Sequence, residues 1–485
     1  MRLFHEHQEP AKIVTISYRN NWADGPGKFD VQLDDVINIF DYFGQNHTDF
    51  YQANPVQAYC KQHRYHIVQR LGQESNENGY QLVTEDGRQA LLRADVDTGQ
   101  IVSITFSTVN SSQTNYAEGY DARGFLSIKY FYDQHGQVTK QEIFNDQGHS
   151  FCTQVFKNGR VVLYKIKFRN QKYTFTDIRD LHGFFYDCLN EDYGEHNLFI
   201  SDRMECTQGL PRMKTAAKKG FYIHNQFVNS WQADIMTAPF NYNYDYGLTH
   251  NDQFDLIFCP TKWEKQEINQ RLNLGEKVQA MPSGNSQVGV PQVKMDQRDP
   301  HLIMMVARIS PEKQVTHALK ILKQVRKQDP LAHLEVYGGI TVKEEAELVN
   351  KTVQDLHLQN HVSFKGIVSD LAPIYDRARV VLVTSYSEGL SLALLEANSH
   401  GVPMVSYNCR YGPSEIVQDD QNGYLVPQDD IDLAAQKVSQ ILQDDQLAQR
   451  LSDGAYNTVD PFSPATSWQK WQHILDTIQA EKASN

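Results

Sequence analysis

The sequence predicts an α/β protein in which an antiparallel β-meander interrupts one of two parallel-sheet domains. From residue 301 onward, short apolar runs alternate with amphipathic segments of helical length, which is typical of a parallel, doubly wound sheet that binds ligands at the carboxyl ends of its strands. Between residues 80 and 172, glycines in turn-like settings recur about every 12 residues and separate segments rich in β-branched and aromatic residues. This spacing predicts the antiparallel meander.

The length and the charge of the chain set broad limits on its class. At roughly 150 residues per domain, 485 residues predict about three modules. The 46 Lys and Arg against 59 Asp and Glu give a net charge of −13, which argues against a protein that wraps nucleic acid with its whole surface. Any polyanion must therefore meet a local basic patch.

The sequence indicates neither a membrane span nor a disulfide framework. No window approaches the roughly 18 consecutive apolar residues of a transmembrane helix, and the first ten residues lack the apolar core of a signal peptide. We therefore expect a cytoplasmic protein, with a peripheral place at the inner face of the membrane as the alternative. The six cysteines form no CxxC pair, and buried thiols are expected.

The expected elements follow from the turn signals and the apolar patterns. The turns of the meander are centred on Gly87, Gly99, Gly124, Gly136, Gly148 and Gly159, with residues 110–113 (NSSQ) in place of one glycine. Buried strands of a second α/β domain, which the meander interrupts, are expected at residues 11–18, 197–201, 220–224 and 254–260.

Two helices are expected near the end of the chain. One long helix spans residues 433–451, and a second spans residues 463–480 after a Ser-Pro start signal. The second helix carries Trp468, Trp471 and Ile474 on one face, so we expect it to pack back on the body of the protein.

The string SYSEGLSLALLEANSHGVP carries the strongest chemical signal. It places Glu388 after a predicted strand, then Gly389, which permits close backbone approach, and then a helix with Glu396 eight residues after Glu388. The free amides and the positive dipole end of that helix favour an anion. Two glutamates at this spacing also suit an ordinary solvated helix face.

Basic residues near a second strand strengthen the prediction of an anion site. Arg308 and Lys313 follow the first strand of the doubly wound domain, in the loop and the first helical turn. Basic groups there face the same crevice as Glu388, so one anionic ligand could contact both loops. Together these residues predict a site for a nucleotide diphosphate, although an exposed basic pair alone would be unremarkable in a surface loop.

Six segments between residues 301 and 428 resemble, in order, the motifs of the retaining glycosyltransferases of family 4: ARISPEKQ, VYGGI, HVSFKGIVSDL, SYSEGLSLALLEA, GVPMVSYNCRYGPSEIV and NGYLVP. The strings RYGPSEIV and KTAAKKGFYIHNQ, together with the β-rich insert, resemble more narrowly the poly(glycerol-phosphate) and poly(ribitol-phosphate) α-glycosyltransferases of Gram-positive bacteria. Near relatives that put GlcNAc on Ser-rich adhesins through the accessory secretion system share the insert. The resemblance implies the α/β GT-B architecture: two facing Rossmann-like domains, with the antiparallel β-meander domain inserted in the N-terminal one.

The resemblance implies a catalytic or donor-binding role for side chains in the matched motifs. Arg308 and Lys313 would neutralise the diphosphate of a UDP-sugar as the sugar leaves, without a metal. Glu388 would hydrogen-bond the donor sugar, and Glu396 the ribose. His224 matches the family histidine that faces the donor sugar from the N-terminal domain, although a lone histidine is more often structural.

Main-chain groups complete the donor site that the resemblance implies. The amides of Gly389, Leu390 and Ser391 would meet the phosphates or the sugar. The segment Lys365, Gly366 and Ile367 would border the uracil.

No cofactor and no metal are expected, because the UDP-sugar is a co-substrate and no ligand cluster accompanies the site. Asp95 and Asp97 form a DxD pair, which binds a divalent ion in another glycosyltransferase architecture. Here the pair falls in a predicted hairpin turn of the meander. Asp430 and Asp432 are expected to begin a surface helix.

The domain boundaries combine the patterns and the resemblance. The predicted parts are residues 1–44 (first part of the N-terminal Rossmann-like domain), 45–172 (inserted β-rich domain), 173–295 (second part of the N-terminal domain, on the acceptor side), 296–455 (nucleotide-sugar-binding domain) and 456–485 (C-terminal helix). Residues 1–9 read as the end of a helix, so we expect either that the first strand and glycine loop of the family lie upstream of Met1 or that the chain as given has weakened activity. The alternative is that another segment fills their place in the sheet.

The predicted activity is that of a hexosyltransferase that moves glucose or GlcNAc from a UDP-sugar to a teichoic acid polymer. A protein O-GlcNAc transferase for Ser/Thr-rich adhesins and a non-catalytic GT-B subunit are the alternatives; a UDP-sugar epimerase fits the meander poorly.

Two basic segments are candidates for guiding a polyphosphate acceptor, with solvated charge as the alternative: Lys165, Lys167, Arg169 and Lys172, and Arg212, Lys214, Lys218 and Lys219. The sheet edges of the meander predict a homo-oligomer or a complex with a related subunit.

Overall fold

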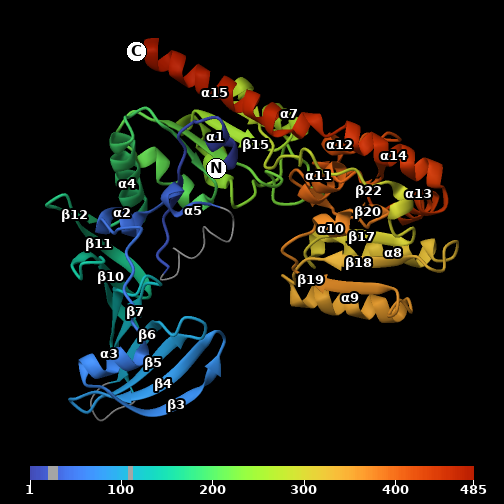
Figure 1. Ribbon diagram of the computed structural model, residues 1–485. Coiled ribbons are helices and arrows are strands. Elements are labelled where there is room, and N and C mark those ends of the chain that lie inside the picture. The colour runs from blue at the N-terminus through green and yellow to red at the C-terminus, as the bar shows by residue number, and fades with distance from the viewer. Residues whose placement is uncertain (20–30, 108–112, 485) are drawn as a thin grey trace. The chain divides into compact units, whose positions relative to one another are not determined.

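The structure is a computed structural model that describes residues 1–19, 31–107 and 113–484 (Figure 1). Internal contacts divide the chain into two compact units. The first comprises Met1–Glu195 and Gln208–Ala216, and the second comprises His196–Thr207 and Ala217–Asn485. The chain therefore crosses from one unit to the other at three points.

The first unit is built around a ten-stranded antiparallel sheet in which each strand pairs with its neighbour in sequence. The strands are β3 (His66–Glu74), β4 (Glu77–Val83), β5 (Gln89–Asp95), β6 (Ile101–Ser107), β7 (Thr114–Tyr120), β8 (Leu126–Tyr132), β9 (Val138–Phe144), β10 (Ser150–Lys157), β11 (Arg160–Phe168) and β12 (Gln171–Phe175). The predicted meander is confirmed. The sheet begins at His66, before the expected residue 80. The apolar pattern did not reveal strand β3, because this strand is exposed and lacks the apolar alternation that marks the later strands.

The turns of the sheet fall where the glycine spacing predicts them. At the turn between β8 and β9, Gly136 has a φ of 74°, a left-handed value that glycine adopts without strain. The hairpin after β5 is also confirmed, because Asp95 Oδ1 accepts hydrogen bonds from the backbone N–H groups of Asp97 (3.1 Å) and Thr98 (2.8 Å). Residues 110–112 of the turn expected at NSSQ lie outside the described part of the chain.

Short helices and a small parallel sheet complete the first unit. They are α1 (Arg2–Glu6), α2 (Ile39–Gly44), α3 (Val56–His63) and α4 (Ile178–Asp192), with β1 (Ile13–Thr15) paired to β2 (Val36–Asn38). The strand expected at residues 11–18 is thus β1, but it belongs to a two-stranded sheet of its own. Asn38 ties that sheet to α2, because its Nδ2 donates to Thr15 Oγ1 (3.0 Å) and its Oδ1 accepts from the N–H of Phe40 (2.9 Å).

The second unit contains the other three expected strands in a four-stranded parallel sheet. Its strands are β13 (Leu198–Ser201), β14 (Lys218–Tyr222), β15 (Leu256–Cys259) and β16 (Val278–Ala280), with α5 (Met204–Thr207), α6 (Asp245–Thr249) and α7 (Lys262–Leu272) between them. The terminal helix α15 (Pro464–Ser484) packs on this sheet through Ile474, which is buried with Phe258 and Met281. The expectation that this helix packs back on the body is confirmed.

A six-stranded parallel sheet forms the rest of the second unit, in the order β19-β18-β17-β20-β22-β24. The strands are β17 (Leu302–Val306), β18 (His333–Tyr337), β19 (Val362–Gly366), β20 (Val380–Val383), β22 (Met404–Tyr407) and β24 (Gly423–Val426). The helices are α8 (Val315–Val325), α9 (Lys343–Asp355), α10 (Ala372–Tyr375), α11 (Leu392–Ser399) and α12 (Pro413–Ile416). This order is that of the doubly wound nucleotide-binding fold, as the apolar pattern predicts.

Helices bury both faces of the six-stranded sheet. Along β17, Ile303 and Met305 join a core cluster with residues of α8 and α9, whereas Leu302 and Met304 join a cluster with residues of α10 and α11. A sheet covered on both faces needs strands that are apolar throughout, which explains the continuous apolar runs of the sequence.

The long helix expected at residues 433–451 is two helices, α13 (Ile431–Gln443) and α14 (Asp445–Asn457). Asp444 ends the first and caps the second, because its Oδ1 accepts from the N–H of Leu447 (2.9 Å). An N-cap aspartate stabilises a new helix start, so a second helix begins here although the apolar periodicity alone predicts one continuous helix. None of the described helices combines the length and the apolar character needed to cross a bilayer.

Candidate active site

The predicted site lies where the strand order of the six-stranded sheet changes direction. Strand β17 pairs with β18 on one side and with β20 on the other, so the connections leave the carboxyl ends of β17 and β20 in opposite directions. A crevice at such a point is the usual ligand site of an open α/β sheet. Arg308 and Lys313 follow β17, and Glu388 follows β20.

Lys313 and Glu388 meet in this crevice. Lys313 Nζ lies 2.8 Å from Glu388 Oε1, and Ser385 Oγ donates to the same oxygen at 2.6 Å. Both side chains of the ion pair are largely buried, with 16% of Lys313 and 13% of Glu388 exposed. The structure thus brings together the two loops that the sequence analysis singled out, and it holds a cation and a carboxylate in fixed positions.

Arg308 lies on the same loop but makes a different contact. Its Nη2 is 3.1 Å from Glu312 Oε1, and 59% of the Arg308 side chain is exposed. Ser310 Oγ also donates to Glu312 Oε1 (2.7 Å), and the carbonyl of Glu312 accepts from the N–H of Tyr386 (2.8 Å). Glu312 therefore links the Arg308 loop to the loop that carries Glu388.

The start of α11 offers an unsatisfied polar group. Ser391 has a left-handed backbone (φ 70°), and its hydroxyl is buried without a hydrogen-bond partner among the described residues. A buried hydroxyl without a partner costs free energy, which a ligand oxygen would recover. Leu390, the preceding residue, is 2% exposed, so its contribution to a ligand would come from the main chain.

The sequence analysis expected Gly389 to let the backbone approach a ligand, and the structure places another part of the chain there. A Cβ atom at Gly389 would lie 2.0 Å from the carbonyl oxygen of His224. Any side chain at this position would collide with the 224 backbone. Gly389 is therefore needed by the packing of the protein itself, and it brings the segment after β14 next to the Glu388 loop.

His224 is held by two neighbours. Its Nε2 hydrogen-bonds Asp202, and its backbone N–H donates to the hydroxyl of Tyr244 (2.9 Å). The hydrogen bond from His224 lowers the pKa of Asp202 below its usual range, so Asp202 is ionised at neutral pH. An ionised carboxylate on one ring nitrogen fixes the orientation of an imidazole.

Glu396 lies on α11 beside an aromatic hydroxyl. Burial raises the pKa of Glu396, and a hydrogen bond with Tyr375 partly opposes that rise. The Tyr375 ring stacks on His400 at 5.5 Å between centroids. The two glutamates of the motif thus occupy different environments: Glu388 faces a lysine, and Glu396 faces a tyrosine.

The segment predicted to border a base lies at the end of β19. Lys365 Nζ is 3.4 Å from Glu335 Oε1, and the carbonyl of Gly366 accepts from the N–H of Gly338 (2.8 Å). Ile367 is 86% exposed, an unusual position for a large apolar side chain. A flat apolar ligand group would cover it.

Sequence analysis did not single out Glu267, on α7, which organises the neighbouring strand. Its Oε1 accepts from Trp263 Nε1 (3.0 Å) and Arg410 Nε (3.2 Å), and its Oε2 accepts from the hydroxyl of Tyr411 (2.9 Å). The last two donors form strand β23 (Arg410–Tyr411), which pairs with β21 (Ser387–Glu388). Glu267 therefore positions the strand next to Glu388. No sequence motif marks it, because Arg410 and Tyr411 lie 143 and 144 residues away in the sequence.

A second carboxyl group on α7 is buried without full hydrogen bonding. Glu264 is 0% exposed, and neither of its oxygens makes a well-formed hydrogen bond to the described residues. Burial first, and then the negative charge of Glu267, hold the pKa of Glu264 well above its usual range, and the N–H of Phe227 offsets this only in part. Burial therefore favours the protonated form of Glu264 in the folded protein.

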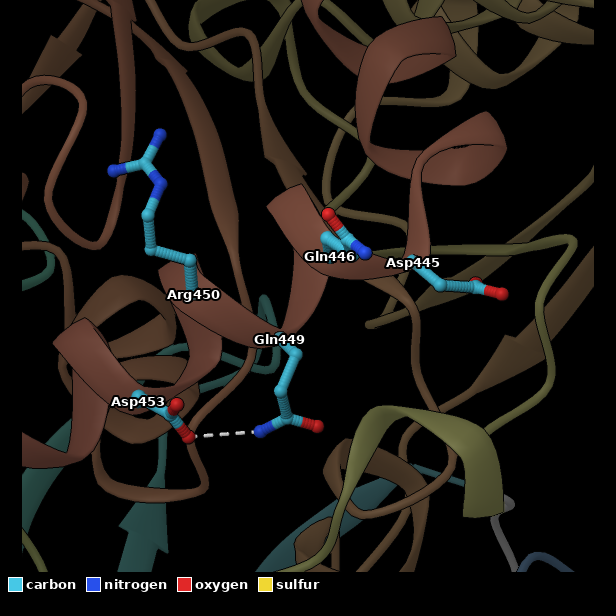
Figure 2. Close-up of a pocket in the computed structure, with 5 residues that line it drawn as sticks. All are labelled: Asp445, Gln446, Gln449, Arg450 and Asp453. Atoms are coloured by element: carbon cyan, nitrogen blue, oxygen red, sulfur yellow. Dashed lines mark hydrogen bonds between the residues drawn. The ribbon is translucent and has the colours of Figure 1, made fainter.

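Two surface hollows lie elsewhere on the second unit. One, of about 470 Å³, lies on α14 and is lined by Asp445, Gln446, Gln449, Arg450 and Asp453 (Figure 2). There Gln449 Nε2 donates to Asp453 (2.8 Å), so two of the lining side chains satisfy each other. The other, of about 480 Å³, is lined by Lys320, Lys323, Gln324, Leu356 and residues 429–432. Neither hollow contains a predicted site residue.

The raised pKa of Glu264 predicts how stability depends on pH. In the unfolded chain Glu264 titrates near its ordinary pKa of about 4.3. Above that pH the chain must therefore take up a proton when it folds, and this uptake becomes more costly as the pH rises. The stability of the wild type should therefore fall relative to Glu264→Gln, by up to about 1.4 kcal/mol per pH unit, as pH rises from 5. Urea unfolding at pH 5, 6, 7 and 8 measures the difference.

The exposed Glu344→Gln, on α9, is the matched control and should run parallel to the wild type at every pH. If the curves of Glu264→Gln and wild type also run parallel, Glu264 is ionised in the folded protein and the assignment of its proton is wrong.

Comparison with known proteins connects this site to a family. Residues 292–458, which contain Arg308, Lys313, Glu388 and Glu396, match the model described as glycosyl transferases group 1. The poly(ribitol-phosphate) α-N-acetylglucosaminyltransferase of Staphylococcus aureus (strain COL) is 21% identical over 98% of this chain and 94% of its own. The poly(glycerol-phosphate) α-glucosyltransferase of Bacillus subtilis (strain 168) is 23% identical over 74% of this chain. Here the match spans about half of the relative, 54% of its length.

Solved structures support the fold. The crystal structure of TarM superposes with a TM-score of 0.79 at 18% identity, covering 97% of this chain and 93% of its own. The pneumococcal O-GlcNAc transferase GtfA in complex with UDP and GlcNAc superposes with a TM-score of 0.78 at 17% identity, covering 99% and 94%. The predicted GT-B class, with its large antiparallel sheet, is therefore confirmed. Residues 292–458 of this chain form a glycosyl transferases group 1 domain within a GT-B fold.

Proposed function

We propose that this protein is a retaining glycosyltransferase of family 4 that moves glucose or GlcNAc from a UDP-sugar to hydroxyl groups of a wall teichoic acid polymer. The observation that carries the proposal is the 2.8 Å contact between Lys313 and Glu388, at the ligand crevice of the group 1 domain. One residue of the pair suits a phosphate and the other suits sugar hydroxyls.

In this mechanism, Lys313 and Arg308 stabilise the departing UDP. When the bond between the sugar and the diphosphate breaks, negative charge grows on the phosphate oxygens, and cations already held in place lower the barrier. Lys313 is preorganised by Glu388, whereas the exposed Arg308 is free to turn from Glu312 towards the diphosphate. The hydroxyl of Ser391 and the main chain of residues 389–391 add hydrogen bonds to the donor.

Glu388 and His224 hold the sugar on its other sides. Glu388 accepts hydrogen bonds from the sugar hydroxyls, and Ser385 limits its rotation. His224, oriented by Asp202, faces the sugar from the segment after β14. The acceptor hydroxyl attacks an oxocarbenium-like sugar from the face that UDP leaves and gives its proton to the departing phosphate oxygen, so the new bond keeps the α configuration.

The polymer is the favoured acceptor because the Staphylococcus relative, which is named for a poly(ribitol-phosphate) activity, matches along almost the whole chain. A protein O-GlcNAc transferase is the second candidate, supported by the likeness to pneumococcal GtfA. Intact Arg308, Lys313, Glu388 and Glu396 argue against a non-catalytic subunit. We place the activity in the cytoplasm or at the inner face of the membrane.

We also propose that the protein assembles as a homo-oligomer or with a related subunit through strand β3. This strand ends the ten-stranded sheet, and all nine of its residues are exposed, including Val68 at 62%. An exposed edge of this length favours pairing with another chain. One structural neighbour, the GtfA/B complex, is itself an assembly of two subunits.

The direct test offers donors and acceptors in parallel. The purified protein is incubated with UDP-glucose or UDP-GlcNAc, and with poly(glycerol phosphate), poly(ribitol phosphate) or a Ser-rich peptide. We expect α-linked sugar on one of the polymers, identified by the anomeric proton in NMR spectra. Transfer to the peptide alone would favour the second candidate, and a β-linked product would contradict retention.

Two substitutions test the site itself. Glu388→Gln and Lys313→Ala should each lower the transfer rate by at least about a hundredfold, the scale expected for loss of one electrostatic contact to the transition state. Initial rates at saturating donor measure the effect. Glu344→Gln and Lys343→Ala, both exposed on α9, are the controls and should transfer at the normal rate. Near-normal rates for either site variant would show that the site is misplaced.

Transfer should persist in excess EDTA, because in the proposed mechanism Arg308 and Lys313 provide the positive charge that a divalent ion provides in other transferases. Rates with and without chelator, after dialysis, give the measurement. Loss of activity in EDTA with recovery in Mn²⁺ or Mg²⁺ would overturn this part of the mechanism.

A further inference from the structure

A segment at one end of the ten-stranded sheet carries positive charge alone. Residues 147–176 contain no Asp or Glu, although the net charge of the whole chain is −13. The segment includes strands β10, β11 and β12, at the end of the ten-stranded sheet opposite β3. It contains six basic residues: Lys157, Arg160, Lys165, Lys167, Arg169 and Lys172.

The two faces of β11 and β12 are different. On one face, aromatic side chains pack on helices α2 and α4: the ring of Phe168 lies 5.2 Å from that of Phe43, and Tyr173 lies 4.4 Å from Phe184. Side chains alternate along a strand, so the intervening residues point to the opposite face. That face carries Lys165, Lys167 and Lys172, all exposed, which we call the lysine strip.

The register of the sheet puts like charges together in the lysine strip. Lys167 of β11 lies directly opposite Lys172 of β12. Lys165 lies two residues from Lys167 on the same face, about 7 Å along the strand. Like charges directly opposite each other in a sheet are destabilising, and a bound anion would offset their repulsion.

The same face neutralises its other lysines. Lys129 Nζ lies 3.0 Å from Glu118, and Lys140 Nζ lies 2.9 Å from Glu142. By contrast, no ion pair involves a member of the lysine strip within the described part of the chain. Arg169, in the turn between β11 and β12, is paired with Asp192 and is not part of the strip. On this face, the lysine strip therefore differs from Lys129 and Lys140, whose charges are offset by neighbouring carboxylates.

Hydroxyl groups flank the lysine strip. Thr174 of β12 and Thr153 of β10 lie directly opposite Lys165 on its two sides, so the three side chains form a row across the strands. A phosphate in that row would meet one ammonium group and two hydroxyl donors. Lysine binds phosphate as a point charge, and threonine hydroxyls are common donors to phosphate oxygens.

We propose that the lysine strip binds the backbone phosphates of the polyol phosphate acceptor polymer. The identity of this polymer as the acceptor rests on the proposed function. The strip is narrow and linear, and the next residue in its row beyond Thr153 is Glu142, a carboxylate. These features suit a single chain with regularly spaced phosphates, whereas an anionic membrane would also meet the flanking carboxylate.

The test removes the charge of the strip without shortening the side chains much. The triple variant Lys165→Gln, Lys167→Gln, Lys172→Gln is compared with Lys323→Gln, Lys327→Gln, Lys351→Gln, which removes three exposed lysines from the group 1 domain. Binding of fluorescently labelled poly(glycerol phosphate) is measured over a range of NaCl concentrations. Thermal unfolding checks that both variants are folded.

For the strip variant we expect binding at least about tenfold weaker than that of wild type at low salt. The slope of log affinity against log salt concentration should decrease in magnitude by about two, because each of the three lost phosphate contacts contributes roughly 0.7 to the slope for a single-stranded polyanion. KM for the polymer should rise by the same factor as the affinity falls. The rate of UDP-sugar hydrolysis without acceptor, which needs the donor site alone, and the behaviour of the control variant should not change.

Unchanged polymer affinity and salt dependence in the strip variant would overturn the proposal, as would an equal loss in the control. Loss of binding to vesicles of phosphatidylglycerol and phosphatidylcholine, with polymer binding intact, would assign the strip to a membrane and also overturn it. If wild type glycosylates only the peptide yet binds the polymer through the strip, the proposed function fails and not the binding surface. If wild type glycosylates the polymer and the strip variant binds the polymer normally, the proposed function stands and only the proposed role of the lysine strip is wrong.

Discussion

The pairing of β17 with both β18 and β20 is the constraint on which the site depends. Because the strand order reverses there, the loops after these two strands separate from the sheet in opposite directions and leave a crevice between them. Lys313 and Glu388 reach that crevice from different loops and meet at 2.8 Å. The ion pair is therefore a consequence of the sheet topology, and the distance of 75 residues between its members in the sequence has no effect on it.

The protein holds its positive charges in two ways. Lys313 is partly buried and paired, and a buried ion pair gives a fixed geometry at a cost in desolvation. Lys165, Lys167 and Lys172 are exposed and have no ion pair within the described residues. Water screens their charges and lowers the free-energy cost of leaving them unpaired. The first arrangement suits a small ligand bound in one pose. The second suits a long, flexible anion whose contacts can exchange along the chain.

Much of the fold could be predicted because its signals are local. The meander follows from glycine turns every 12 residues, and the six-stranded sheet follows from apolar runs of strand length. The start of the meander at His66 could not be predicted, because β3 is exposed on both faces and has no alternating pattern. In the site, the convergence of Lys313 and Glu388 was predictable from strand ends. The close approach of His224 to Gly389 was not, since it depends on tertiary packing between distant segments.

Glu267 shows why such packing decides the position of a candidate site residue, Glu388. Glu388 belongs to β21, a strand of two residues that has little stability of its own and pairs with the equally short β23. Glu267 accepts hydrogen bonds from both residues of β23, Arg410 and Tyr411, and thereby anchors the pair of strands to α7. Glu264 lies one turn earlier on the same helix, and its burial and the charge of Glu267 raise its pKa well above the usual range. A negative charge on Glu264 would repel Glu267 and loosen the anchor, so the raised pKa of Glu264 favours the observed position of Glu388.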